Sequence, residues 1–171
     1  VKGDNFQAIF NLQTGAIQQL KYGERNIFLE GNGPQLDAYR APTDNDAGMG
    51  YPSAWFQNGL YDMQHTVKDW SYTAKKDGTY QLNFTVESQG KEGADQKYSN
   101  RDRDPESAYR FGENKRALKE DDLKFTTRQI YTIYRDGSIE LQSAISANRS
   151  NVVLPRIGYS MVLPSGLDAF D

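Results

Sequence analysis

The sequence predicts an all-β, antiparallel fold, and three observations support this prediction. Apolar and polar residues alternate in most segments outside residues 35–51 and 91–122, which is the period of a strand with one buried face. An Asp-Gly pair separates two alternating runs at Asp77-Gly78 and again at Asp136-Gly137, and this pair strongly signals a β-hairpin. The 171 residues include 11 Tyr and 8 Phe, which favour half-buried pleated surfaces. Such a chain is typical of a β-sandwich or a related architecture.

The N-terminal part is expected to form a three-stranded meander. Its strands are predicted at residues 6–10, 17–22 and 27–29, and turn-rich segments separate them. Glycine and proline at residues 31–34 end the meander, because both residue types interrupt strands and helices.

One short helix is expected after the irregular residues 35–51. Ser53 is the predicted cap of a helix through residues 55–60, because its hydroxyl can accept hydrogen bonds from the first free amide groups. Pro52, which precedes it, suits the start of a helix.

Strands return in the second half of the chain. Residues 67–74 and 80–86 form the first predicted hairpin, residues 125–134 and 139–145 form the second, and residues 156–163 form a last strand.

A charged insertion interrupts this pattern at residues 91–122. It holds 8 basic and 9 acidic residues, and Leu118 is its only aliphatic residue beyond alanine. Such a stretch buries too little apolar surface to offset the cost of ordering the chain. We interpret it as an exposed loop with a helix near residues 114–120. Either it is simply solvated, or it binds a partner or covers a site.

Composition excludes several classes of function. The net charge of -3 and the pI of about 5.2 argue against nucleic-acid binding. No apolar run approaches the length of a membrane span, and the mean hydropathy is -0.80.

Cysteine and histidine usage also limits the chemistry. The absence of cysteine excludes thiol chemistry, and the single histidine, His65, excludes a multi-histidine metal site. No cofactor-binding motif occurs. The cellular compartment stays open.

The densest polar cluster lies at residues 40–46. In an extended segment Asp44 and Asp46 would project to the same side, and paired carboxylates can serve acid–base chemistry or bind a cation. The spacing of a calcium loop fails at Gly48, and no metal site is predicted. The alternative interpretation is structural: the two acids form turns or cap a helix, with Arg40 as their ionic partner.

Aromatic residues near the predicted helix allow two interpretations. Tyr51, Trp55 and Phe56 could stack on a sugar ring, or they could pack against a sheet. His65 has no nucleophile at motif spacing, so it is expected to be an ordinary polar residue, and no catalytic residue is predicted.

The sequence resembles a known family over nearly its whole length apart from residues 91–122. Residues 39–48 (YRAPTDNDAG) resemble the R-A-P-x-D-N-D-x-G motif of the β-galactosidase small-chain domain. Residues 10–17 resemble its entry hairpin, residues 131–139 a later hairpin, and residues 154–158 its P-R-I-G strand. The order of these motifs is preserved.

The resemblance implies a single domain over residues 1–171, the N-terminal part of a galactose-mutarotase-like supersandwich. It implies a parent enzyme of glycoside hydrolase family 2 that hydrolyses terminal β-galactosides through two glutamates in a separate barrel, upstream of Val1. No catalytic residue carries over. Five motif residues carry over as an architectural signature: Arg40, Pro42, Asp44, Asn45 and Asp46.

The expected function is therefore a non-catalytic domain that supports the catalytic barrel and shapes the rim of its active site. The expected partners are other domains of the parent and a carbohydrate, with self-association through exposed sheet edges. Two alternatives stay open: a carbohydrate-binding module that uses Trp55 and Tyr51, and a mutarotase-like enzyme. A shared fold does not by itself confer the mutarotase reaction, and a single histidine leaves it without its usual acid–base pair.

Overall fold

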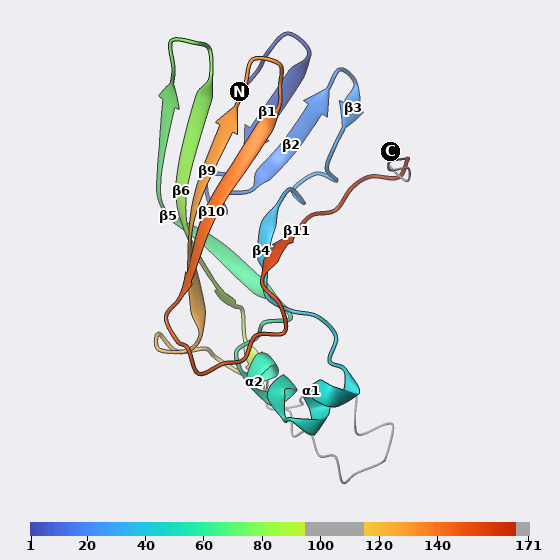
Figure 1. The fold of residues 1–171 in the computed structure, drawn as a ribbon, viewed down its shortest axis with the longest axis vertical. Coiled ribbons are helices and arrows are strands. Elements are labelled where there is room, and N and C mark those ends of the chain that lie inside the picture. The colour runs from blue at the N-terminus through green and yellow to red at the C-terminus, as the bar shows by residue number, and fades with distance from the viewer. Residues whose placement is uncertain (95–114, 167–171) are drawn as a thin grey trace.

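The structure, a computed structural model, describes residues 1–94 and 115–166. In chain order its elements are β1 (Phe6–Phe10), β2 (Ile17–Tyr22), β3 (Arg25–Asn26), β4 (Gln35–Asp37), α1 (Asp44–Gly48), α2 (Tyr51–Gln57), β5 (Met63–Ala74), β6 (Tyr80–Gly90), β7 (Gly93–Ala94), β8 (Lys115–Arg116), β9 (Lys124–Ile133), β10 (Ile139–Ala147) and β11 (Gly158–Ser160). The strands pair antiparallel throughout (Figure 1), which confirms the predicted all-β sandwich class.

The largest sheet has four strands in the order β10-β9-β6-β5. It contains both predicted hairpins, and each Asp-Gly turn is confirmed. Gly78 (φ 84°) and Gly137 (φ 89°) take the left-handed conformation that these turns require. The Asp77 carboxylate accepts a hydrogen bond from the Thr79 amide at 2.9 Å, which fixes the first turn. Along β6 every second side chain is buried, as the alternating sequence predicts.

A three-stranded sheet, β1-β2-β3, covers the upper half of the large sheet in Figure 1. The side chains between them form what we call the upper core: Phe6, Ala8, Ile17, Leu20, Phe28, Leu82, Phe84, Val86, Tyr131 and Ile133. The third strand was predicted at residues 27–29, and this prediction was wrong, since β3 is Arg25–Asn26. The chain turns inward after Asn26, which buries Phe28, and Leu29 then donates to the Val162 carbonyl at 2.8 Å.

Two short helices lie at the lower end of the molecule (Figure 1), where one was predicted. The extra helix is α1, so Asp44 and Asp46 belong to a helical turn and not to an extended segment. The predicted helix begins earlier than expected, at Tyr51 after Gly50. Ser53 is therefore inside α2 and does not cap it. The apolar residues here form the lower core: Leu36, Ala38, Trp55, Leu60, Leu123 and Phe125.

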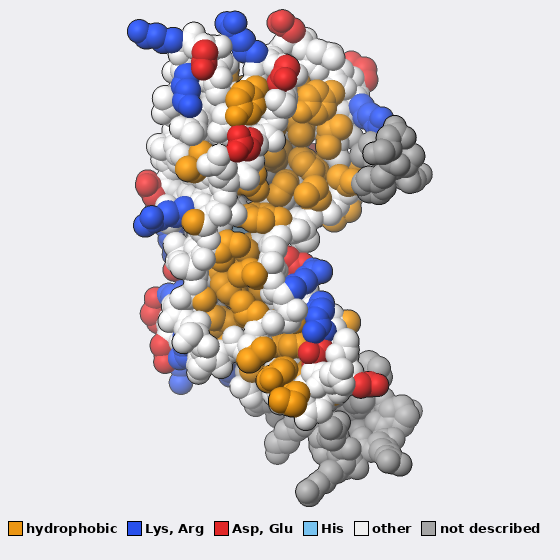
Figure 2. All heavy atoms as spheres, in the orientation of Figure 1, with side chains coloured by type: hydrophobic (Ala, Val, Ile, Leu, Met, Phe, Trp, Pro, Cys, Tyr) orange, Lys and Arg blue, Asp and Glu red, His pale blue; other side chains and the backbone are white. Residues whose placement is uncertain are grey.

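The last strand is shorter than predicted. Of residues 156–163 only Gly158–Ser160 forms a strand, β11, which pairs with β4 in a segment expected to be irregular. Val162 instead bonds to the loop after β3, donating to the Asn32 carbonyl at 3.0 Å. Along residues 153–163 five large apolar side chains stay 42% to 54% exposed: Val153, Ile157, Met161, Val162 and Leu163. Figure 2 shows hydrophobic side chains gathered over the upper strands and along the middle of this face.

The charged insertion is described only at its two ends, and residues 95–114 lie outside the described residues. The ends meet, because β7 pairs with β8. The helix predicted near residues 114–120 is wrong over residues 115–120, which form β8 and a turn. Among the described residues no helix is long and apolar enough to cross a membrane. The single domain over residues 1–171 stays a prediction.

Candidate functional site

The motif at residues 40–46 is organised around the Arg40 guanidinium. Its Nη1 donates to Asp46 Oδ2 at 2.6 Å and its Nη2 to Asp46 Oδ1 at 3.1 Å, which makes a bidentate ion pair. Its Nε donates to the Pro155 carbonyl at 3.2 Å. The guanidinium also lies 5.6 Å from the ring centroid of Trp55. Arg40 therefore joins α1, α2 and a segment about a hundred residues later in the chain.

Asp46 is the second centre of the motif. Besides Arg40, it accepts a hydrogen bond from the Thr43 amide at 2.8 Å and from the Thr43 hydroxyl at 2.7 Å. Thr43 in return accepts from the Asp46 amide, so the two residues form a capping box at the start of α1. These bonds, with the Arg40 bond first, hold the pKa of Asp46 well below its usual range. Asp46 is thus part of the cap of α1 and is the ionic partner of Arg40 in this structure.

Two motifs that lie far apart in the sequence meet at this place. Asp37, just before the first motif, forms an ion pair with Arg156 of the segment PRIG. The Trp55 ring nitrogen donates to the Val153 carbonyl at 2.6 Å. With the bond from Arg40 to Pro155, these contacts fasten the lower end of the molecule to the segment that leads into β11.

Trp55 is only 1% exposed, so its ring packs in the lower core and presents no face to a ligand. Tyr51 is half-buried and packs against the same core. Phe56 is also buried, at 2% exposure, so Tyr51 is the most exposed of the three aromatic residues.

The motif also has an outward side. Asp44 and Asn45 are exposed in the first turn of α1, and Met49, just after that helix, is 66% exposed. Within the part of the chain that the structure describes, their side chains make no ion pair or hydrogen bond. Arg40 and Asp46 make contacts within the fold, whereas Asp44, Asn45 and Met49 lie exposed at the surface.

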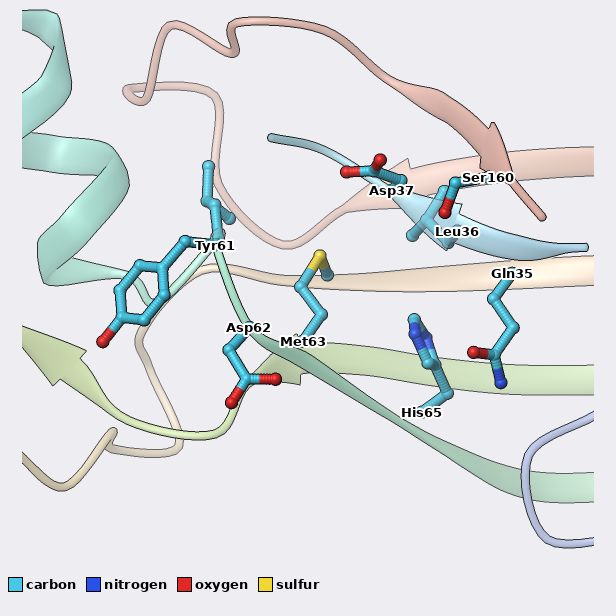
Figure 3. Close-up of a pocket in the computed structure, with 9 residues that line it drawn as sticks. Gln35, Leu36, Asp37, Tyr61, Asp62, Met63, His65 and Ser160 are labelled. Atoms are coloured by element: carbon cyan, nitrogen blue, oxygen red, sulfur yellow. The ribbon is translucent and has the colours of Figure 1, made fainter. Parts of the chain in front are cut away.

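A pocket of about 230 Å³ lies between the β4–β11 pair and the start of β5. Figure 3 shows polar side chains from several elements around it. Its polar lining consists of Gln35, Asp37, Tyr61, Asp62, His65 and Ser160, and its apolar lining of Leu36, Leu60 and Met63. Sequence reasoning did not connect these residues, because they come from three separate segments without a shared motif.

His65, the only histidine, forms part of the wall of this pocket. Its Nδ1 lies 2.9 Å from the hydroxyl of Ser88, which is fully buried. Burial lowers the pKa of His65, so its neutral form is favoured near neutral pH. The ring can therefore offer one hydrogen bond to the pocket without bringing a charge.

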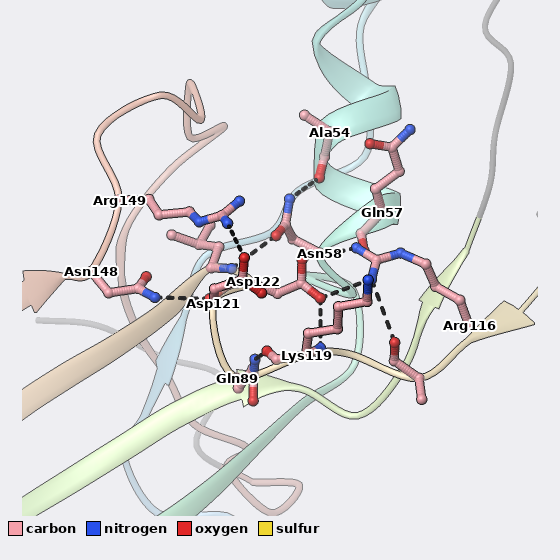
Figure 4. Close-up of polar contacts among 12 residues, drawn as sticks. Ala54, Gln57, Asn58, Gln89, Arg116, Lys119, Asp121, Asp122, Asn148 and Arg149 are labelled. Atoms are coloured by element: carbon pink, nitrogen blue, oxygen red, sulfur yellow. Dashed lines mark hydrogen bonds and ion pairs between the residues drawn. The ribbon is translucent and has the colours of Figure 1, made fainter.

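A second polar network, at the returning end of the charged insertion, was not predicted (Figure 4). Arg116 makes a bidentate pair with Asp122, at 2.8 and 3.1 Å, and also donates to the Gln57 carbonyl at 2.9 Å. Asn58 accepts from the buried Leu123 amide at 3.0 Å. The Arg116 bond first, with the Lys119 amide, lowers the pKa of Asp122 to about 2. This network ties α2 to the beginning of β9.

The carboxyl groups of the described residues share one property. Each of those whose pKa departs from its ordinary value departs downward, because bonds to cations, amides or hydroxyls favour the ionised form: Asp46, Asp77, Glu87, Asp122, Asp136 and Glu140. Over residues 1–94 and 115–166, no three His, Cys, Asp or Glu side chains gather closely enough to hold a metal ion.

Comparison with models of known families matches residues 2–171 to the family described as β-galactosidase small chain. The match includes every segment on which the sequence resemblance depends. None of the curated proteins compared with the chain matches it.

Proposed function

Because the chain belongs to the β-galactosidase small-chain family, we propose that it is a non-catalytic structural domain of a β-galactosidase that hydrolyses terminal β-galactosides. In this role the domain supports the catalytic barrel of the parent enzyme, and the end that carries α1 contributes to the rim of the active site. The observation that carries the proposal is the division of the motif between inward and outward residues.

The inward half of the motif supports a structural role. Arg40 is bonded to Asp46 and to the Pro155 carbonyl, and its guanidinium lies over Trp55. The hydrogen bonds that the guanidinium makes among the described residues therefore all serve the fold. A retaining glycosidase also needs one carboxyl with a raised pKa beside a second, ionised one. Where the structure describes the chain, the carboxyl groups with shifted pKa values move the opposite way.

The outward half supports a contact with another domain. Asp44, Asn45 and Met49 are exposed on one short stretch of chain. A large exposed apolar side chain beside polar groups is common where two protein surfaces meet. We therefore place the contact with the barrel at this end of α1.

The first test is enzymatic. The purified chain is incubated with a chromogenic β-galactoside, and we expect no turnover above the buffer rate. Turnover that disappears in Asp44→Ala or Asp46→Ala would overturn the proposal, since it would place catalysis within this chain.

The second test uses the full-length parent enzyme. Met49→Asp introduces a charge at the proposed contact, and we expect it to lower the temperature at which galactosidase activity is lost. It should leave the thermal midpoint of the isolated chain unchanged, because Met49 is 66% exposed. The matched control is Leu12→Asp, an apolar residue 45% exposed on the loop between β1 and β2. An equal loss of thermal stability in both variants would contradict a contact between α1 and the barrel.

Carbohydrate binding is a second candidate function, and the pocket beside β4 favours it. Its volume of about 230 Å³ and its polar lining around a small apolar floor suit a compact ligand with several hydroxyl groups. Trp55 and Tyr51 pack in the lower core, so the pocket takes their place in this hypothesis. Titration of the chain with galactose should then give saturable shifts that Gln35→Ala weakens. Asn83→Ala, on the opposite face of the large sheet, is the control.

A further inference from the structure

The free edge of β10 carries our further inference. β10 is the terminal strand of the four-stranded sheet, and among residues 1–94 and 115–166 the only strand that pairs with it is β9. Of its nine residues only Glu140 is charged, and the strand contains no proline, lysine or register shift. Natural edge strands normally carry such features, because an unprotected edge pairs with other strands.

The opposite edge of the same sheet shows that protection. β5 has a register shift between Val67 and Asp69, and Lys68 lies at the shift. The loop between β1 and β2 also covers it, since Val67 donates to the Gln13 carbonyl at 2.7 Å. Any strand that joins the sheet therefore meets less resistance at β10 than at β5.

Hydrogen-bond parity identifies which groups of β10 point outward. Just outside the strand, Tyr134 donates to the Ser138 carbonyl at 2.9 Å and Asn148 to the Lys124 carbonyl at 3.1 Å. In an antiparallel pair, bonded and non-bonded positions alternate. The even-numbered residues of β10 therefore bond to β9. The backbone groups that face the open edge belong to Ile139, Leu141, Ser143, Ile145 and Ala147.

We propose that β10 pairs with β10 of a second copy of this chain, antiparallel and centred on Ser143, to give one continuous sheet through a two-fold dimer. In this register all nine residues of each strand are paired. The outward-pointing residues face one another, so each such pair exchanges both of its hydrogen bonds.

The side chains match in the same register. On the face that bears the cores, Leu141 meets Ile145 and Ile139 meets Ala147, so apolar residues adjoin apolar residues. On the other face Glu140 lies opposite Ser146, so the two Glu140 side chains, the only charged ones in the paired strands, do not face each other. The interface is isologous and pairs the β10 edge of each copy with that of the other, so the assembly is a closed dimer.

The first experiment measures mass. Light scattering or sedimentation of the chain over a range of concentrations should show a reversible monomer–dimer equilibrium. Ser143→Pro removes an outward-pointing amide without touching the bonds to β9, and it should shift the equilibrium to monomer. We expect the dimer dissociation constant to rise by about tenfold or more, which is about 1.4 kcal/mol. A monomer at every concentration would overturn the proposal, as would a dimer that Ser143→Pro leaves unchanged.

A matched pair of charged variants separates the register from a general effect of charge. Ser143→Lys places two like charges against each other at the two-fold centre, and it should weaken the dimer. Gln142→Lys places its charge opposite Ala144, on the other face, and should leave the dimer intact. Equal weakening by both variants would contradict the register.

Disulfide trapping gives a readout even where the proline variant fails to fold. The chain has no cysteine, so a single one reports one contact. Across a bonded antiparallel pair the Cα atoms lie about 5.5 Å apart, within the range of a disulfide. Ser143→Cys should therefore form a disulfide-linked dimer on mild oxidation. Ser146→Cys, whose copies lie far apart in this register, should not, and the reverse result would exclude the pairing.

Discussion

The upper and lower cores of this chain are built by different means. In the upper core, strands with alternating sequence place Leu82, Phe84 and Val86 against the β1–β2–β3 sheet. In the lower core, helices and loops surround Trp55, and polar side chains with fixed partners hold these segments together. The upper core is built mainly by strands whose side chains alternate between buried and exposed. The lower core depends on specific hydrogen bonds between residues that lie far apart in the sequence.

This difference explains why charged and polar residues are dense at the lower end. A loop or short helix carries backbone groups that no sheet satisfies, and each one must find another partner. Arg40, Arg116 and Asn58 provide such partners to the carbonyl groups of Pro155 and Gln57 and to the amide of Leu123. The density of polar residues in the motif thus follows from the irregular backbone around it.

The largest expected effect tests whether the two cores unfold together. Trp55→Ala in the lower core and Phe84→Ala in the upper core should each cost about 3–5 kcal/mol of unfolding free energy. Because β9 contributes Phe125 to the lower core and Tyr131 to the upper one, we expect a single transition in both variants. Urea unfolding followed by circular dichroism gives the measurement.

Fluorescence provides an independent probe of that comparison. The chain has two tryptophans, Trp55 in the lower core and Trp70 on β5, 46% exposed. In a Trp70→Phe background the emission reports the lower core alone. Loss of Trp55 emission at a lower urea concentration than the loss of sheet signal would show that the cores are independent.

The upper core could be predicted from the sequence, and most of the lower core could not. Alternation and the Asp-Gly pairs located the four long strands, because a strand and a hairpin turn are local patterns. β3 and β11 differ from prediction, and Leu29 and Val162, which were expected in these strands, bond instead to distant parts of the chain. The sequence offered the pairing of Arg40 with Asp46 as one of two interpretations of the motif. The contact of Arg40 with Pro155 depends on the tertiary fold, which no local pattern encodes.

The candidate site follows the same division. The motif residues were identified from their sequence, and their inward and outward roles came only from the structure. The pocket beside β4 joins Gln35, His65 and Ser160, which no spacing rule connects. The network of Arg116 and Asp122 lay in a segment interpreted as an exposed loop, because its composition is charged. Charge content alone does not distinguish a solvated residue from one that bonds a neighbouring helix.

The second-largest expected effect is a loss of stability of the lower core at acidic pH. The pKa of Asp122 falls from its ordinary 3.8 to about 2 in the folded chain, mainly through Arg116. A lowered carboxyl pKa stabilises the folded state above the ordinary value, and this contribution disappears as the pH falls from about 4 to about 2. Asp122→Asn should therefore cost about 2 kcal/mol at pH 7 and almost nothing at pH 2.

Urea midpoints at several pH values between 7 and 2 measure this dependence. The matched variant is Asp136→Asn in the β9–β10 turn, where Ser138 lowers the pKa of an exposed carboxyl. We expect a smaller change there, because solvent screens an exposed charge. If Asp136→Asn altered the acid transition more than Asp122→Asn, the proposed contrast between the two regions would be reversed.

The smallest effect isolates the cap of α1 from the rest of the motif. Thr43→Ala removes the hydroxyl that donates to Asp46 at 2.7 Å and accepts from its amide, and it should cost about 1 kcal/mol of unfolding free energy. Thr43→Ser keeps the hydroxyl and should restore most of the loss. Ser138→Ala removes a comparable hydroxyl bond, to Asp136, from an upper hairpin that the β9–β10 ladder already holds. We expect it to cost less than Thr43→Ala, because α1 has five residues and few other bonds to define it. Equal costs would mean that the short helix depends on its packing and that the capping box is secondary.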